Sequence, residues 1–209
     1  DLADALASEL ADALRRNETA TLCVPGGTTP GPIFDVLAAQ ALDWDRVHVF
    51  LSDERWVPED NPRSNARLVK ARLLVAEAAG ARFLPLYRPV PEPEEALDAV
   101  AETIAPHLPI SVLLLGMGAD MHTASLFPGA DGLTAALAAS APPLMAIRAP
   151  DAGEARVTLT APVLAGAMSS HIVITGEEKR AAVERAGGLT VQQAPVRAIL
   201  PQAVVHWAP

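Results

Sequence analysis

The feature that most constrains the fold is an alternation between short, largely apolar runs and longer segments with helical periodicity. The apolar runs have the length of buried strands. Strands are expected over residues 21–24, 47–51, 83–86, 111–115, 157–160, 172–175 and 196–200. Strands that are apolar on both faces and separated by helices are typical of a parallel sheet with helices packed on both sides. The pattern therefore predicts a three-layer α/β/α sandwich with a mostly parallel sheet.

Periodic leucines predict the first helix. They recur at every fourth position from Leu2 to Leu14 among Asp, Glu and Ala, which is typical of an amphipathic helix that ends near Arg16. Further helices are expected from a proline at 30 or 32 to residue 37, and over 67–79, 92–104 and 177–186. Ser64 is the candidate N-cap of the helix over 67–79.

Length and composition restrict the domain organisation and the class of partner. A chain of 209 residues, of which 50% are apolar, is expected to form one domain over 1–209. The net charge of −9 and the lack of a basic run argue against nucleic acid and anionic membranes as partners. The single cysteine, Cys23, fits a reducing compartment. Because there is no apolar stretch of about 18 residues and no recognisable secretory signal, a cytoplasmic protein is expected.

In sheets of this kind, ligands bind beyond the carboxyl ends of the strands, so the residues that directly follow each strand are the informative ones. The first such segment contains Gly26, Gly27 and Thr28, between a buried strand and a helix. Glycines allow a positive φ and close approach, so that successive N–H groups can point at one anion. A phosphate site and an ordinary tight turn are both consistent with this segment.

The second segment places Asp53, Glu54 and Arg55 directly after a strand. Carboxylates beside a guanidinium are found in surface ion pairs, but charges gathered at the end of a strand more often have a function. Asp53 and Arg55 are therefore predicted to bind substrate.

The third segment contains His122, which follows a strand and a pair of glycines, with Asp120 close by. An imidazole oriented by a carboxylate is suited to act as a general base near neutral pH. The G-x-G-x-x-G pattern of dinucleotide sites would need glycine where Met121 stands, so a dinucleotide cofactor is not expected. The spacing of His and Cys residues does not predict a metal site.

The fourth segment joins Arg156, at the start of a strand, with Lys179, in the first turn of a predicted helix. A lysine at this end of a helix is on the unfavourable side of the helix dipole, which suggests that it faces an anion. An exposed, solvated lysine is the alternative.

Together and in this order, the segments resemble the 6-phosphogluconolactonase family, within the wider group of glucosamine-6-phosphate deaminases and isomerases. The resemblance rests on the motifs at 26–30, 52–58 with 64–65, and 122–129, and it extends from about residue 24 to residue 179. It implies a Rossmann-like α/β/α sandwich that binds no nucleotide. It also implies hydrolysis of a sugar-phosphate lactone, 6-phosphoglucono-δ-lactone, to 6-phosphogluconate in the oxidative pentose phosphate pathway, with neither a metal nor an organic cofactor.

The resemblance also implies roles for individual residues. The phosphate is expected on the backbone of residues 26–28, with Arg55 and Lys179 as counter-charges and Arg156 as a further candidate. His122 is expected to take a proton from the attacking water. We expect Asp120 to orient the imidazole, with Asp53 or Glu54 as the alternatives.

One residue departs from the family pattern. Family members usually have glycine between the Asp and the His of this loop, and here the residue is Met121. If the backbone needs a positive φ at this position, Met costs about 1 kcal/mol or more in strain, or the loop takes another path and displaces His122.

Two other functions are alternatives. Deaminases and isomerases of the group add a Glu a few residues after the loop His, whereas residues 123–127 here are Thr, Ala, Ser, Leu and Phe. A lactonase is therefore expected rather than a deaminase. The other alternative is a sugar-phosphate-binding module without turnover, for which Met121 is the one supporting feature.

Overall fold

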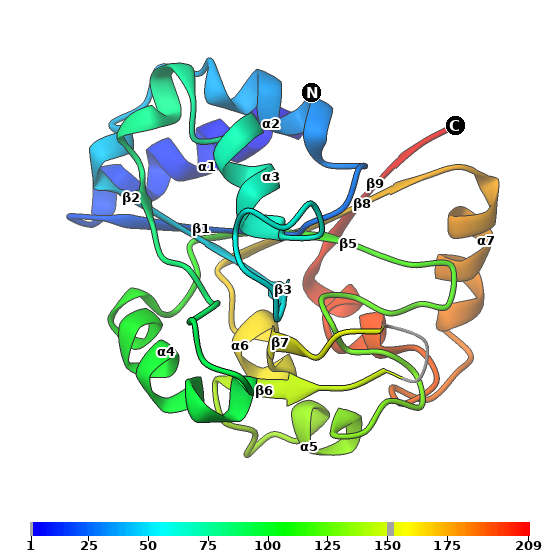
Figure 1. The fold of residues 1–209 in the computed structure, drawn as a ribbon. Helices are drawn as coiled ribbons and strands as arrows, with labels where there is room; N and C mark the ends of the chain where they lie inside the picture. Colours follow the sequence, from blue (N-terminus) through cyan, green and yellow to red (C-terminus); the bar gives the residue numbers. More distant parts are fainter. Residues whose placement is uncertain (1, 150–152) are drawn as a thin grey trace.

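A computed structural model describes residues 2–149 and 153–209. A parallel sheet of six strands has the order β4-β2-β1-β5-β8-β9, and every neighbouring pair in it is parallel (Figure 1). Its strands are β1 (Ala20–Val24), β2 (Val47–Leu51), β4 (Arg82–Phe83), β5 (Val112–Gly116), β8 (Ser169–Thr175) and β9 (Val204–Ala208). The neighbouring strands β2, β1 and β5 are almost wholly buried, as their apolar sequences predict.

Helices pack on both sides of this sheet, which confirms the three-layer α/β/α sandwich. Figure 1 shows α1, α2 and α3 on one side and α4, α5 and α6 on the other. The α-helices are α1 (Leu2–Arg16), α2 (Gly31–Ala38), α3 (Asn65–Arg72), α4 (Leu97–Ile104), α5 (Leu133–Leu137), α6 (Ala161–Ala165) and α7 (Glu177–Ala186). Short 3₁₀ helices cover Trp44–Arg46, Ala76–Gly80, Pro93–Glu95, Ala105–His107, Pro195–Ala198 and Leu200–Gln202. Among the described residues, no helix has the length and apolar character needed to cross a membrane.

A second, antiparallel sheet has the strand order β3-β7-β6, with β3 at Asp53–Arg55, β6 at Leu144–Ile147 and β7 at Arg156–Leu159. The strand expected over 157–160 is therefore present, but it belongs to this sheet and not to the parallel one. Ser52 joins the two sheets, because its N–H donates to Val24 O of β1 and its carbonyl accepts from Leu159 N–H of β7. The direction of β7 depends on this tertiary pairing, which local sequence does not encode.

The prediction of a strand over 196–200 is wrong. This segment forms two 3₁₀ helices, and the last strand, β9, follows it. Pro195 and Pro201 each lie in the first turn of one of these helices and lack the N–H that a strand ladder needs. Val196 and Ile199 are nevertheless fully buried, so their apolar character reflects the core and not a strand.

Other elements are shorter than predicted. The helix expected over 67–79 begins earlier and ends at Arg72, and Ala76 (φ 50°) then starts a 3₁₀ turn. Ser64 is its N-cap, as predicted, and accepts a hydrogen bond from Arg67 N–H at 3.2 Å. The strand expected over 83–86 is cut to two residues before Pro85, which has no N–H for the ladder. The helix expected over 92–104 is divided into a 3₁₀ turn and α4.

Candidate functional site

A cavity of about 240 Å³ lies at the carboxyl ends of β1, β5 and β8. It brings together all four segments that the sequence singles out. The lining residues are Pro25, Gly26, Gly27, Thr28, Thr29, Pro30, Asp53, Arg55, Asn65, Gly116, Met117, Gly118, His122, Ala124, Arg156, Val173 and Lys179. Parallel strands end at one edge of the sheet, which explains why segments far apart in sequence meet there.

The glycine turn after β1 forms one wall of the cavity. A side chain at position 26 would overlap the amide group of Asn65, so close approach requires Gly26. Gly27 has a φ of +85°, and a Cβ at this position would meet no atom of the described residues within 4 Å. Glycine is therefore favoured here by the backbone conformation and not by a lack of space for a side chain. The turn leads through Thr28 into α2, which begins at Gly31. This arrangement is suited to presenting backbone N–H groups to an anion.

Arg55 extends from β3 into the cavity. One guanidinium nitrogen (Nη1) donates to the carbonyl of Arg63 at 2.6 Å. The Nε of Arg55 is buried and has no hydrogen-bond partner in the described part of the chain. A buried N–H group without a partner is costly, so Arg55 carries a hydrogen-bond donor that the described part of the protein does not satisfy.

Arg156 comes from β7, beside Arg55 in the antiparallel register. It is 9% exposed, and its Nε also has no hydrogen-bond partner among residues 2–149 and 153–209. Burial, with smaller contributions from Arg55 and Arg63, lowers the pKa of Arg156, although Asp53 and Glu154 act in the opposite direction. A second cation therefore lines the same cavity.

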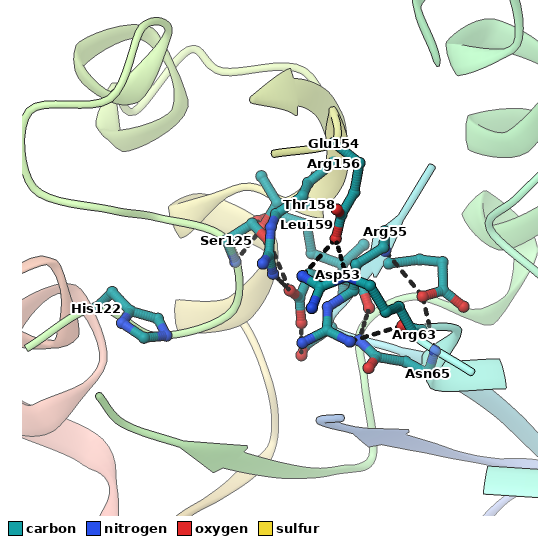
Figure 2. Close-up of polar contacts among 12 residues, drawn as sticks. Asp53, Arg55, Arg63, Asn65, His122, Ser125, Glu154, Arg156, Thr158 and Leu159 are labelled. Atoms are coloured by element: carbon teal, nitrogen blue, oxygen red, sulfur yellow. Dashed lines mark hydrogen bonds and ion pairs between the residues drawn. The ribbon is translucent and has the colours of Figure 1, made fainter. Parts of the chain in front are cut away.

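Asp53 is held from several sides (Figure 2). Its Oδ1 accepts from the Ser52 hydroxyl at 3.0 Å and its Oδ2 from the Ser125 hydroxyl at 2.5 Å. Oδ2 also lies 3.9 Å from Nη1 of Arg156. Both oxygens already have partners within the protein, so Asp53 can hold Arg156 and Ser125 in place from the wall of the cavity.

Glu54 is fully buried, and the hydrogen bonds of its carboxylate go to residues other than His122. Its carboxylate accepts hydrogen bonds from the N–H groups of Arg55, Asn65 and Ala66, each at 2.8 Å, and from the Ser64 hydroxyl at 3.1 Å. Burial raises the pKa of Glu54, and the three backbone hydrogen bonds only partly offset this. The carboxylate thus caps the first turn of α3, which places the Asn65 side chain against Gly26.

The imidazole of His122 is bound by Asp120. The distance from Nδ1 to Oδ1 is 2.5 Å, and Oδ1 also accepts the backbone N–H of His122 at 3.1 Å. Burial by itself would raise the pKa of Asp120, but the hydrogen bonds and charge attraction of His122 outweigh it, so that the pKa lies below 3.8. A carboxylate can only accept, so Nδ1 carries the proton and Nε2 is left as the basic nitrogen.

The loop that carries His122 has the left-handed turn that glycine favours. Met121 has a φ of 68°, and its N–H donates to Gly118 O at 2.9 Å, while Gly118 N–H donates to His122 O at 3.0 Å. A side chain at Gly118 would overlap the His122 ring and the Asp120 carboxylate. Met121 thus occupies a strained position, and the loop keeps His122 at the cavity.

Phe127 is a contact that the sequence reasoning missed. Its ring stacks on the His122 imidazole, with centroids 4.3 Å apart and an interplanar angle of 30°. The guanidinium carbon of Arg156 lies 5.1 Å from the centroid of the Phe127 ring. Phe127 thereby links the imidazole to Arg156. An aromatic residue soon after the loop histidine is the one sequence signal that could have indicated this contact.

Lys179 lies in the first turn of α7 and lines the cavity, as expected of a lysine that faces an anion. Within the described ranges it has no hydrogen-bond or ion-pair partner. Figure 2 shows His122 to one side of the group formed by Asp53, Arg55 and Arg156. The site therefore combines an imidazole, three cationic side chains and a glycine turn in one cavity.

The remaining histidines have other partners. His48 stacks on His107 with centroids 4.0 Å apart, and His171 bonds to His206 at 2.9 Å and to Glu9 at 2.8 Å. In the part of the chain that the structure describes, no group of three or more His, Cys, Asp or Glu side chains is arranged to hold a metal ion.

Comparison with known proteins adds evidence about the origin of this site. Residues 1–207 match the sequence profile of the family described as glucosamine-6-phosphate isomerases/6-phosphogluconolactonase. The chain belongs to this family. A 6-phosphogluconolactonase of Rhizobium meliloti is 42% identical over 217 residues, which cover 100% of this chain and 93% of the relative. Another of Mesorhizobium japonicum is 44% identical over 220 residues, which cover 100% of this chain and 91% of the relative.

A solved member of the family has nearly the same fold. The crystal structure of a 6-phosphogluconolactonase from Shewanella baltica has a TM-score of 0.96 and 34% sequence identity, and covers 100% of this chain and 91% of that chain. Because the family match spans residues 1–207, all four segments around the cavity lie within the region that the chain shares with the family.

Proposed function

We propose that this chain is a 6-phosphogluconolactonase, which hydrolyses 6-phosphoglucono-δ-lactone to 6-phosphogluconate in the oxidative pentose phosphate pathway. The observation that carries the proposal is the shared cavity, which is lined by His122, a glycine turn and three cationic side chains. The relatives from Rhizobium meliloti and Mesorhizobium japonicum have the same activity in their names and align with the whole chain.

The phosphate binds at the glycine turn in this mechanism. Backbone N–H groups of Gly26, Gly27 and Thr28 donate to its oxygens, and Arg55, Arg156 and Lys179 balance its charge. Both arginines line the cavity, which brings two guanidinium charges to the site proposed for the phosphate. These local cations offset the net charge of −9, which by itself opposes the approach of an anionic substrate.

His122 acts as the general base on the other side of the cavity. Its Nε2 takes a proton from water while the water oxygen bonds to the lactone carbonyl carbon. The tetrahedral intermediate collapses with cleavage of the bond to the ring oxygen, and the imidazolium returns the proton to that oxygen. One water is consumed, and Asp120 stabilises the imidazolium through Nδ1.

The decisive test compares the wild-type chain with H122N in a lactonase assay coupled to a dehydrogenase. Because the lactone also opens spontaneously, every rate is read against an enzyme-free control. Wild type is expected to accelerate the reaction, and H122N to lose about 10²- to 10⁴-fold in kcat with KM largely kept. Wild-type kcat in H122N would remove the general-base role. Release of ammonia from glucosamine 6-phosphate would favour a deaminase, and tight binding of 6-phosphogluconate without turnover would favour a binding module.

A further inference from the structure

Gly176 is the hinge between β8 and α7, the helix that carries Lys179. It has a φ of 83° and a ψ of 156°, a conformation that essentially only glycine adopts. A Cβ at this position would have nothing within 4 Å, so the hinge is not packed from that side. Its orientation therefore depends on hydrogen bonds to its backbone groups.

Those hydrogen bonds come largely from the last strand. Gly176 N–H donates to Ala208 O at 2.9 Å, and Gly176 O accepts from the indole Nε1 of Trp207 at 3.2 Å. The same carbonyl accepts the first helical hydrogen bond of α7, from Arg180 N–H at 3.3 Å. Both the N–H and the carbonyl of Gly176 are thus hydrogen-bonded to residues of β9.

Trp207 also contacts the helix beyond the hinge. The guanidinium carbon of Arg180 lies 4.8 Å from the centroid of the indole ring, a cation–π contact. Gly176 and Arg180 lie on either side of Lys179 in the sequence, so the indole contacts the chain both before and after this lysine. Trp207 is 39% exposed, so burial in the core is not what holds the ring there.

The position of the Lys179 ammonium follows from these contacts. In the described chain the side chain has no ion-pair partner that would direct it, so the direction of the first turn of α7 decides whether it reaches the cavity. We propose that Trp207 is a positioning residue for phosphate binding, which holds the Gly176 hinge and through it Lys179. This inference rests on the proposed function, in which Lys179 balances the charge of the substrate phosphate.

The test measures KM and kcat for two lactones, 6-phosphoglucono-δ-lactone and glucono-δ-lactone, which lacks the phosphate. W207F keeps a ring over Arg180 but removes the N–H, and W207L removes both contacts. We expect KM for the phosphorylated lactone to rise about 3-fold in W207F and about 5- to 10-fold in W207L, with kcat within twofold. Hydrolysis of glucono-δ-lactone is expected to be unchanged, because this substrate has no phosphate for Lys179 to bind.

Two controls separate positioning from general damage. V204A removes an exposed side chain of the same strand that is not part of the hinge contact, and it is expected to leave both substrates unaffected. The double variant K179A/W207L is expected to have the KM of K179A, because the indole acts through the lysine.

Three results would contradict the positioning role of Trp207. An unchanged KM in both Trp207 variants, an equal loss with both lactones, or additive effects of K179A and W207L would overturn the positioning role. If W207L fails to fold, W207F decides on the same criteria. If K179A itself leaves KM for the phosphorylated lactone unchanged, Lys179 does not bind the phosphate. That result would contradict the proposed phosphate site as well as the role of Trp207.

Discussion

At the scale of single residues, the groups around the cavity differ in how far the protein satisfies their hydrogen bonds. The Nε atoms of Arg55 and Arg156 are buried without partners in the described chain, whereas both oxygens of Asp53 are occupied. The carboxylate is therefore neutralised within the protein, whereas Arg55, Arg156 and Lys179 bring positive charge to the cavity, which is what an anionic ligand needs. At His122, Asp120 binds one ring nitrogen, Nδ1, and leaves the other, Nε2, for proton transfer.

Removal of one of these donors is expected to weaken binding more than turnover. R55A should raise KM for the phosphorylated lactone about 10- to 100-fold, because a charge-assisted hydrogen bond is lost, while kcat changes little. Steady-state kinetics measure both constants. R67A is the matched control, since Arg67 lies on α3 and does not line the cavity. An unchanged KM in R55A would exclude Arg55 from the phosphate site.

Met121 allows a direct measurement of backbone strain. Its φ of 68° places it in the left-handed region, which costs a residue with a Cβ about 1 kcal/mol or more relative to glycine. M121G and M121A both remove the side-chain packing, so their difference isolates the backbone effect. We expect M121G to have the larger free energy of unfolding in urea, by about 1 kcal/mol. Equal stability of the two variants would mean that the loop relaxes out of this conformation.

At the scale of elements, the start of α3 connects the antiparallel sheet to the glycine turn. The Glu54 carboxylate accepts two backbone N–H groups and one hydroxyl there, and a third N–H from Arg55 of β3. Asn65, in the first turn, packs against Gly26. A buried carboxylate with four donors holds a helix start firmly, because each N–H would otherwise lack a partner. The shape of the phosphate turn therefore depends on β3 and α3 together.

The replacement of Glu54 with Gln tests this connection. The amide NH₂ of Gln would face donors instead of accepting from them, so E54Q should lower the free energy of unfolding by about 2–3 kcal/mol. Chemical denaturation followed by circular dichroism measures the change. The exposed Glu77 provides the control, and E77Q is expected to have little effect. Wild-type stability of E54Q would show that the cap contributes little.

At the scale of the whole molecule, the cavity lies where the two sheets meet. The parallel sheet supplies the glycine turn, the His122 loop and α7, and the antiparallel sheet supplies Asp53, Arg55 and Arg156. Ser52 connects the sheets through backbone hydrogen bonds to a strand of each. Neither sheet alone forms the site.

Stability of the whole fold is expected to fall in mild acid. Burial lowers the pKa of His48, His107 and His206 below 6.5, with smaller contributions from neighbouring charges for His48 and His206. The folded state thus favours the neutral imidazoles, so this contribution is fully present above pH 6.5 and is lost as the pH falls below it. Thermal unfolding between pH 7.5 and about 5 should show a decreasing Tm, with a smaller decrease in H107Q. A Tm that does not change below pH 6.5 would contradict this interpretation.

Most of the parallel sheet and the positions of the four site segments were predictable from the sequence. The reason is that apolar runs identify buried strands locally, and strand ends identify where a ligand binds in a parallel sheet. Of the two possibilities that the sequence left open at Met121, a positive φ or another path of the loop, the structure has the positive φ.

Only the tertiary structure decided which distant groups meet. The strand expected at 157–160 belongs to the antiparallel sheet, and the segment expected as a strand at 196–200 forms 3₁₀ helices. Both segments are apolar because they are buried, and burial alone does not determine the sheet or the type of secondary structure. Likewise, the bond from Ser125 to Asp53 and the contact of Trp207 with Gly176 join residues 72 and 31 positions apart. Local patterns determine strands and turns, whereas the pairing of side chains depends on the packing of the whole chain.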